Sequence, residues 1–515
     1  MKNIFINYQF LQTIGSSITN RGDLVFFKGK KTAEDNKQVP LSRNLEKNTA
    51  HLKQLFSFGL NKDFSTREIT ARYSNKKIKL FFYSSIVNST KIHEGIIRPL
   101  LEAKGENLNS IITLEAIKEL TDFDSIVDDI NSGNVVLLLE DCKTAYSVNV
   151  ADFQHRGIEK PENENAVKAP KEAFTESLNV NISLVRKRFH DKQLIAEAKP
   201  VGNRSKLDVT IMYIKDVVNN EVLENVRERL DQLSVDNVRN IESLEQYIEE
   251  RPYSIVSSLL YTERPDRASS YLEDGYIVLL MENSSACLVL PVTFWSFFHS
   301  EEDRYLRFLF GNFSRLIRLV AFLISLLVSA VYVAITNYHS EMIPPDLLLA
   351  IVSARERVPF PVVFEIMLME VSFELIREAG LRIPNPLGPT IGIVGALIIG
   401  QAAVEANIVS PIVVIVVALS GLSSFAVANI SMNFTIRISR FLFIFAASFF
   451  GMLSLTGAFL LWVMYLASLR SFGVPFLSPL SPNYKSTNDT VFRKIIKNEY
   501  FRPGQIKPKD SRKKG

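Results

Sequence analysis

Long apolar stretches follow one another between residues 319 and 469, whereas residues 1–318 are mostly polar. An α-helix rises about 1.5 Å per residue, so about 20 apolar residues cross a hydrocarbon core about 30 Å thick. The clearest candidate spans are residues 319–335, 388–404, 412–428 and 441–466. Four such stretches in close succession are not expected in a soluble protein. We therefore predict a polar N-terminal region followed by an α-helical polytopic membrane domain.

The distribution of positive charge predicts which side of the membrane each end faces. Arg315 and Arg318 precede the first apolar stretch, and residues 337–342 after it contain no Lys or Arg. Residues 485–515 carry ten Lys or Arg and three acids. Because Lys and Arg are enriched on the cytoplasmic side, we predict cytoplasmic N- and C-termini. Four spans agree with this topology, whereas five would place the basic tail outside. The tail either contacts anionic lipid headgroups, or is a solvated disordered segment, or does both.

Composition and motifs argue against several classes of protein. The two cysteines, Cys142 and Cys287, cannot make a disulfide framework, which is typical of a reducing compartment. No secretory signal is evident at the N-terminus. The six histidines show no metal-ligand spacing, and there is no phosphate-binding loop, nucleophile elbow or HExxH pair. We therefore expect no cofactor, no metal and no enzymatic activity.

The polar region contains a repeated pattern that predicts two related α/β modules in tandem. Residues 133–140 (GNVVLLLE) align with residues 275–282 (GYIVLLME), and the strand candidate 79–83 (KLFFY) corresponds to 209–213 (VTIMY). In both halves the order is strand, amphipathic helix, helical segment and strand. Chance similarity between apolar strands is the alternative explanation.

We predict the following division of the chain. It comprises a variable, disordered segment at 1–48, a first α/β module at 49–155, a charged linker at 156–174, a second α/β module at 175–310, a helical transmembrane domain at 311–480 and a basic cytoplasmic tail at 481–515. The linker is dense in charge and contains two prolines, which is typical of an exposed segment. The basic residues at 186–188 have no interleaved aromatic residues, so we expect no binding of nucleic acid.

The linker and several later segments resemble a known family. Residues 156–188 (RGIEKPENENAVKAPKEAFTESLNVNISLVRKR) resemble the hallmark linker of the GerA family of bacterial spore germinant-receptor A subunits. Further similar segments follow in the same order, at 209–215, 264–267, 294–305, 359–378, 384–401 and 468–475. The resemblance covers residues 50–480, nearly the whole chain.

This resemblance implies a subunit of the inner membrane of the spore. Such subunits work with a transporter-like B subunit that binds the nutrient and with a lipoprotein C subunit. The resemblance implies a homo-oligomer that forms a nutrient-gated cation channel and triggers germination. A paralogue group associated with dipicolinate release has the same architecture and is an alternative within the family.

Acidic residues in the membrane half are the main candidates for an ion pathway. Residues 362–379 predict a helix that carries Glu365, Glu370, Glu374 and Glu378 among apolar residues. Carboxylates inside a bilayer are costly and therefore face protein, water or a pathway. In an oligomer, one Glu per subunit makes an acidic ring that favours cations. The alternative is an interfacial or half-inserted helix whose acids lie among headgroups or pair with Arg355, Arg357 or Arg377.

Other polar residues near the apolar stretches are weaker candidates. Gln401 and Glu405 lie near the end of the stretch at 388–404, where they would line water. The candidate Asn429 and Asn433 follow the next stretch, and Arg437 and Arg440 precede the last; these four residues form either a polar gating band or a loop at the membrane surface. The glycines of 388–400 favour close packing of helices.

A second hypothesis makes the chain a receptor or assembly scaffold. In this case the α/β modules bind a small molecule or a partner protein, and the helical part, surrounded by lipid, only anchors them. Arg156, Glu159 and Glu176 in and after the linker are then the candidate contacts between modules or with a partner.

Overall fold

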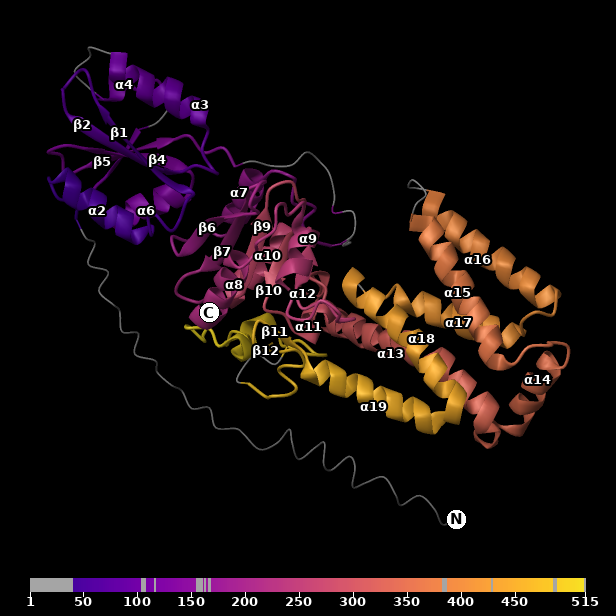
Figure 1. The fold of residues 1–515 in the computed structure, drawn as a ribbon. Coiled ribbons are helices and arrows are strands. Elements are labelled where there is room, and N and C mark those ends of the chain that lie inside the picture. The colour runs from indigo at the N-terminus through magenta and orange to yellow at the C-terminus, as the bar shows by residue number, and fades with distance from the viewer. Residues whose placement is uncertain are drawn as a thin grey trace, which may run out of the picture.

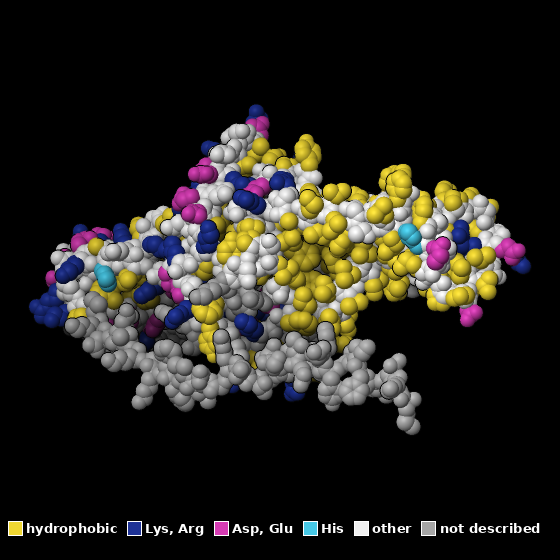
Figure 2. All heavy atoms as spheres, turned by 90° about the horizontal axis from the view of Figure 1, so that it is seen from below, with side chains coloured by type: hydrophobic (Ala, Val, Ile, Leu, Met, Phe, Trp, Pro, Cys, Tyr) yellow, Lys and Arg dark blue, Asp and Glu magenta, His cyan; other side chains and the backbone are white. Residues whose placement is uncertain are grey.

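The computed structural model describes residues 40–102, 108–114, 117–153, 161, 164, 168–381, 387–427, 429–484 and 489–513. A sheet-containing N-terminal region is followed by a helical C-terminal region (Figure 1). Hydrophobic side chains spread over the surface of the helical region, whereas most charged side chains in view lie on the sheet-containing region (Figure 2). The predicted combination of an α/β N-terminal region with a helical C-terminal region is confirmed.

The first sheet has five antiparallel strands in the order β1-β2-β4-β5-β3. The strands are β1 (Phe64–Thr70), β2 (Lys77–Tyr83), β3 (Ile117–Leu120), β4 (Asn134–Leu139) and β5 (Ala145–Asn149). Helices α2 (Leu45–Leu55) and α6 (Phe123–Asn131) cover one face; α3 (Ser89–Ile92), the π-helix η1 (His93–Ile97), α4 (Arg98–Glu102) and α5 (Leu108–Ile111) cover the other. Because side chains alternate along a strand, Val136 and Leu138 face α6, whereas Val135 and Leu137 face the other layer.

The second sheet repeats this arrangement, with strand order β6-β7-β9-β10-β8. Its strands are β6 (Leu194–Val201), β7 (Leu207–Ile214), β8 (Leu260–Thr262), β9 (Ile277–Met281) and β10 (Cys287–Leu290). Helices α7 (Leu178–Arg188) and α10 (Pro265–Asp274) pack on one face, and α8 (Asn220–Asp231) and α9 (Ile241–Ile248) on the other. Both sheets therefore have the same strand order, as the repeated sequence pattern predicts. The predicted domain boundaries remain predictions.

Local details recur at equivalent places in the two sheets. Gly133 and Gly275 precede the equivalent strands β4 and β9, and their φ angles of 85° and 96° lie in the left-handed region that glycine adopts easily. The Asn48 side chain in α2 accepts the backbone N–H of Ser42 and donates to the backbone carbonyl of Ser42. Asn181 in α7 makes the same two bonds with Thr175. These shared contacts make chance similarity an unsatisfactory explanation of the repeat.

A buried ion pair joins the two sheet regions. Arg186, at the end of α7, pairs with Asp63 just before β1, and both side chains are almost fully buried. Asp63 also accepts hydrogen bonds from the backbone nitrogen and the hydroxyl of Ser85, both at 2.9 Å. The Arg186 guanidinium lies 3.9 Å from the centre of the Tyr83 ring. Because Asp63 and Tyr83 belong to the first sheet region and Arg186 belongs to the second, the pair fixes how the two regions sit on each other.

The helical region is built around α13 (Phe308–Tyr338), which contacts α17, α18 and α19 along its length. The other helices are α14 (Pro345–Arg355), α15 (Val362–Leu381), α16 (Leu387–Glu405), α17 (Pro411–Ser424), α18 (Ile430–Phe450) and α19 (Met452–Ser468). Among the described residues, α13 and α18 are long and apolar enough to cross a membrane, and Val394–Glu405, α17 and α19 are shorter apolar helices. The short helices α11 (Phe294–Phe298) and α12 (Glu302–Tyr305) lead from the second sheet into α13.

The prediction of a single span at residues 441–466 is wrong. The structure divides this stretch at Gly451, where α18 ends and α19 begins. Gly451 has φ 62° and ψ −129°, and a Cβ atom added there would lie 2.8 Å from the Cβ atom of Tyr338. Only glycine allows this turn against the end of α13. The predicted span at 412–428 is also too long, because α17 ends at Ser424.

The prediction of a solvated, disordered tail is wrong for residues 489–513, which we call the C-terminal strap. After α19 the chain forms the short strands β11 (Arg470–Ser471) and β12 (Val474–Pro475) and then runs back over the second sheet region. Lys509 donates its backbone N–H to Val217 at 2.9 Å, and the Asn219 side chain donates to the carbonyl of Ile506 at 3.1 Å. The tail folds back because Ile506 is buried in the same core as the second sheet.

We predict that Arg186→Gln destabilises the chain by about 3–5 kcal/mol, because it leaves the Asp63 carboxylate buried without its charged partner. The free energy of unfolding of the purified full chain in detergent measures this. Arg204→Gln is the matched control, because Arg204 pairs with Asp236 while its side chain is 84% exposed. Exposed pairs contribute less than about 1 kcal/mol. Equal losses in both variants would contradict a joint at Asp63.

Candidate functional site

The buried acids of α15 form a charge network with α18. Glu370 is 1% exposed, and it accepts a hydrogen bond from the Ser329 hydroxyl of α13 at 2.7 Å. Its other carboxylate oxygen lies 3.0 Å from Arg440, which is equally buried. Arg440 also donates to the Ser420 hydroxyl of α17 at 2.7 Å. The network therefore links four helices around one ion pair.

Glu374 extends the network by one helical turn. One of its carboxylate oxygens accepts from Arg440 at 2.8 Å, and the other pairs with Arg437. Arg377 lies 3.6 Å from Glu374 and donates to the Ser424 hydroxyl at 3.0 Å. Residues four apart share a face of a helix, as do residues three apart, so α15 presents Glu370 and Glu374 to Arg437 and Arg440 of α18. Glu370 and Glu374 thus find their partners inside the same chain.

Glu365 is held separately, near the start of α15. Its side chain is fully buried and accepts the backbone N–H of Ser410 at 2.8 Å, just before α17. Its other oxygen lies 3.4 Å from Arg355 at the end of α14. Of the pairings considered from the sequence, Arg355 with Glu365 and Arg377 with Glu374 are present. The pairing of Arg440 with Glu370 was missed, although two arginines in an otherwise apolar helix signal that buried acids lie nearby.

The other candidates for an ion pathway have different surroundings. Asn429 is buried and caps α18, accepting the backbone N–H of Met432 at 3.1 Å, so its placement is explained by the helix start. Gln401 is exposed on α16 and donates to Glu405 at 2.9 Å. Their roles in an ion pathway remain predictions.

The candidate contacts in the linker are only partly described. Arg156 and Glu159 lie outside the described residues. The backbone carbonyl of Glu176 accepts the N–H of Asn283 at 2.9 Å, which ties the start of α7 to the loop after β9. A partner role for these residues remains a prediction.

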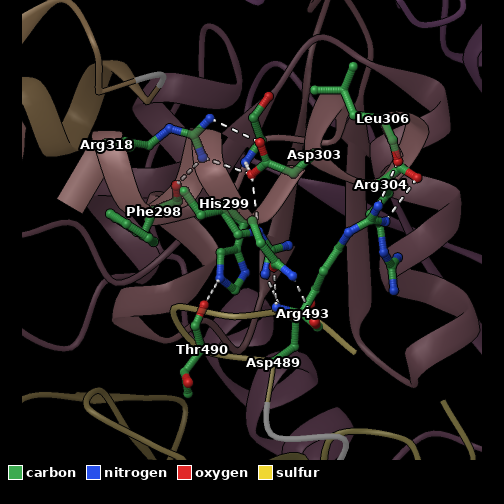
Figure 3. Close-up of polar contacts among 12 residues, drawn as sticks. Phe298, His299, Asp303, Arg304, Leu306, Arg318, Asp489, Thr490 and Arg493 are labelled. Carbon is green, nitrogen blue, oxygen red and sulfur yellow. Dashed lines mark hydrogen bonds and ion pairs between the residues drawn. The ribbon is translucent and has the colours of Figure 1, made fainter. Parts of the chain in front are cut away.

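A second charge network lies where the second sheet region meets α13 (Figure 3). Asp303, in α12, accepts from Arg318 at 2.8 Å and lies 3.3 Å from Arg315. Arg315 and Asp303 are each 1% exposed. Arg315 also pairs with Asp489 of the strap. The first turns of α13 are therefore tied both to the sheet region and to the strap.

His299 and Arg493 complete this junction network. The Nε2 atom of His299 lies 2.5 Å from the carbonyl oxygen of Thr490, so Nε2 carries the proton and donates. Burial, together with the charge of Arg315, lowers the pKa of His299 to about 4. Arg493 donates to the carbonyls of Arg304 and Leu306 at 3.2 and 2.6 Å. The histidine is therefore neutral at physiological pH, and its role here is to hold the strap.

Both networks consist of ion pairs and hydrogen bonds. Among the described residues, no group of three or more His, Cys, Asp or Glu side chains is close enough to hold a metal ion. The arginines of both networks face carboxylates, hydroxyls or carbonyls. Such an arrangement fixes the relative positions of helices and can change only by exchanging one set of partners for another.

Known proteins are similar to this chain across both its regions. A family model described as Bacillus/Clostridium GerA spore germination protein matches residues 50–505. Spore germination protein KA of Bacillus subtilis (strain 168) is 35% identical over 94% of this chain and 90% of its own length. Spore germination protein GerLA of Bacillus cereus is 32% identical over 88% of this chain and 94% of its own.

One solved structure is also similar. The N-terminal domain of the A subunit of the Bacillus megaterium spore germinant receptor GerK3 aligns with a TM-score of 0.39 at 22% identity. The alignment covers 50% of this chain and 98% of that domain.

We predict that Arg440→Gln costs about 3–5 kcal/mol of stability, because Glu370 then remains buried and unpaired. Adding Glu370→Gln to Arg440→Gln should recover part of this loss, since the amide needs no counter-charge. Thermal unfolding of the single and double variants in one detergent gives the coupling energy. Arg357→Gln is the control, because Arg357 is exposed at the loop before α15. A double variant whose loss equals the sum of both single losses would exclude the pairing.

We also predict a pH-dependent contribution of His299 to stability. Its pKa is about 4 in the folded chain against an ordinary value of 6.5. Between pH 4 and 6.5 the unfolded chain therefore binds the extra proton, and the folded chain loses stability as the pH falls. The loss reaches about 3 kcal/mol near pH 4.

Unfolding of wild type and of His299→Gln across pH 4–6.5 tests this contribution, and the His299→Gln profile should be flatter by that amount. His93→Gln is the matched control, because His93 is exposed. Burial raises the pKa of Glu301 to about 7, so protonation of Glu301 stabilises the folded chain as the pH falls. This contribution is the same in all three proteins. Parallel profiles for wild type and His299→Gln would show that His299 is not held neutral.

Proposed function

This chain belongs to the GerA family of Bacillus/Clostridium spore germination proteins, and we propose that it is the A subunit of a nutrient germinant receptor in the spore inner membrane. The single observation that carries the proposal is similarity over residues 50–505, which include both five-stranded sheets and helices α13 to α19. We assign the chain no catalytic step and no cofactor. We propose that the chain works with B and C subunits, as the family resemblance implies.

We further propose a multi-pass topology with both termini in the cytoplasm, which agrees with this role. The chain enters α13 and leaves α19 beside the second sheet region (Figure 1). Arg315 at the start of α13 pairs with Asp303, and Ser468 at the end of α19 accepts hydrogen bonds from Arg251. Entry and exit on one side require an even number of crossings. The basic residues of this side match the cytoplasmic enrichment of Lys and Arg.

We further propose that several copies of the chain form a nutrient-gated cation channel. Helix α16 is suited to contact a neighbouring copy, because it packs mainly on α15 and leaves apolar side chains such as Leu397, at 67% exposure, without a partner. Gln401 and Glu405 lie on the same helix and are exposed. A ring of such carboxylates, one from each subunit, favours cations.

The buried acids are less suited to line this pathway in the described conformation. Glu370 and Glu374 are neutralised by Arg437 and Arg440, and Glu365 is fully buried beside Arg355. They would reach a pathway only if α15 and α18 separated. We therefore propose that Gln401 and Glu405 line the pathway and that the α15–α18 network holds its closed form.

A cleft between the sheet regions favours the receptor or scaffold role as a second candidate. The cleft has a volume of about 500 Å³ and is lined mainly by polar residues, among them Ser85, Asn88, Asp152 and Asn179. Pockets that hold small molecules have volumes of about 300–1,000 Å³. In this case the helical region only anchors the chain.

The experiment is nutrient-triggered potassium release from spores that carry the chain with Glu405→Gln and Gln401→Leu together. We expect release to slow at least several-fold at normal protein abundance, because the pathway loses its carboxylate ring. Glu356→Gln is the matched control, since Glu356 is exposed but lies in the turn after α14. A parallel variant, Glu370→Gln with Arg440→Gln, should change when release begins rather than abolish it. Unchanged release in both double variants would move the pathway elsewhere and favour the scaffold role.

A further inference from the structure

A small polar cavity lies beneath the C-terminal strap, beside α10. Its volume is about 90 Å³, which is room for about three water-sized groups. Its walls come from α10, from the segment 293–304 and from the strap, and include Tyr276, Trp295, Glu301, Arg304 and Gln505. It is separate from the α15–α18 network and from Gln401 and Glu405 of α16.

The strap closes this cavity by contacts along its length. Arg502 donates to the carbonyl of Glu273 at 2.8 Å, and Lys513 pairs with Asp274 at 2.6 Å. At the other end Asp489 pairs with Arg315. A bound group would therefore be enclosed by residues separated by about 200 positions in the sequence.

Two buried polar side chains that line the cavity have an atom without a hydrogen-bond partner in the described chain. They are the Trp295 Nε1–H donor and the Gln505 Oε1 acceptor, in residues that are 6% and 8% exposed. A buried polar group that lacks a partner costs about 1–3 kcal/mol. Both side chains line the same small space, so one occupant can satisfy them together.

The charges of the lining leave one carboxylate unmatched. Asp274 pairs with Lys513, Asp489 with Arg315, and Glu499 lies 3.5 Å from Arg304. Within the described residues, Glu301 makes no ion pair and no side-chain hydrogen bond. The positive charges that act on it are Arg304 and Arg267, and these pair with Glu499 and Glu164. The nearby Arg493 is already directed at the carbonyls of Arg304 and Leu306.

We propose that this cavity binds a small monovalent cation, potassium or ammonium, with its hydration water. The cation lies between the Glu301 carboxylate and Gln505 Oε1, and its water accepts the Trp295 N–H. A single unmatched carboxylate suits one positive charge, whereas a divalent ion requires several carboxylates. The cavity volume excludes bulky quaternary ammonium ions. Because the strap supplies Gln505, occupancy stabilises the closed strap. This proposal does not rest on the channel role.

The two tryptophans of the chain allow a direct test. Trp295 lines the cavity, and Trp462 lies in α19, so Trp462→Phe leaves Trp295 as the sole tryptophan. The full chain in detergent is titrated with KCl, with NH4Cl and with choline chloride at constant ionic strength. The titration is made at pH 8, because burial raises the pKa of Glu301 to about 7 and the carboxylate must be ionised. We expect a saturable change of Trp295 emission with potassium or ammonium, and none with choline.

Matched variants locate the response. In the Trp462→Phe background, Glu301→Gln should reduce the affinity at least tenfold, whereas the neighbouring Glu302→Gln, which does not line the cavity, should not. The difference between KCl and NH4Cl shows which cation is preferred. An equal response to choline, or a response that persists in Glu301→Gln, would overturn the proposal. If Glu301→Gln does not fold, the comparison of potassium with choline in the parent chain still decides, because an empty or water-filled cavity responds to neither.

Discussion

Buried pairs of arginine and carboxylate hold the successive parts of this chain together. Arg186 with Asp63 joins the two sheet regions, Arg315 with Asp303 joins the second sheet region to α13, and Arg440 with Glu370 joins α18 to α15. Arg315 and Arg440 are the largest fully buried side chains of the described chain. Because an unpaired buried charge is far costlier than a lost apolar contact, each joint tolerates only arrangements that keep it paired.

This constraint explains why the strap packs on the second sheet region. Arg315 has two carboxylate partners, Asp303 from α12 and Asp489 from the strap. Movement of the strap would remove one of them and expose His299, which is neutral and bonded to Thr490. A change in the sheet regions therefore reaches α13 through a small set of charged contacts. The α15–α18 network lies further along the same bundle and contacts α13 through Ser329.

The sequence predicted those features that have a local or periodic signal. The repeat of 133–140 at 275–282 predicted the equivalent strands β4 and β9. Glu370 and Glu374 are four residues apart and therefore share a face of α15. Arg377 was considered from the sequence as a partner of these acids, but Arg440 was not, because it lies 70 residues beyond Glu370 and only the packing of α18 on α15 brings it there.

The remaining errors have the same origin. Apolar character continues through Gly451 without interruption, so hydropathy alone does not mark the turn that the close approach of Tyr338 requires. The strap is strongly basic and resembles a solvated tail, yet its buried anchor is a single apolar residue, Ile506, supported by backbone bonds. In each case a contact between distant segments decides the structure. Such contacts are also where this chain can be switched, because an ion pair between two segments depends on both and breaks when either one moves.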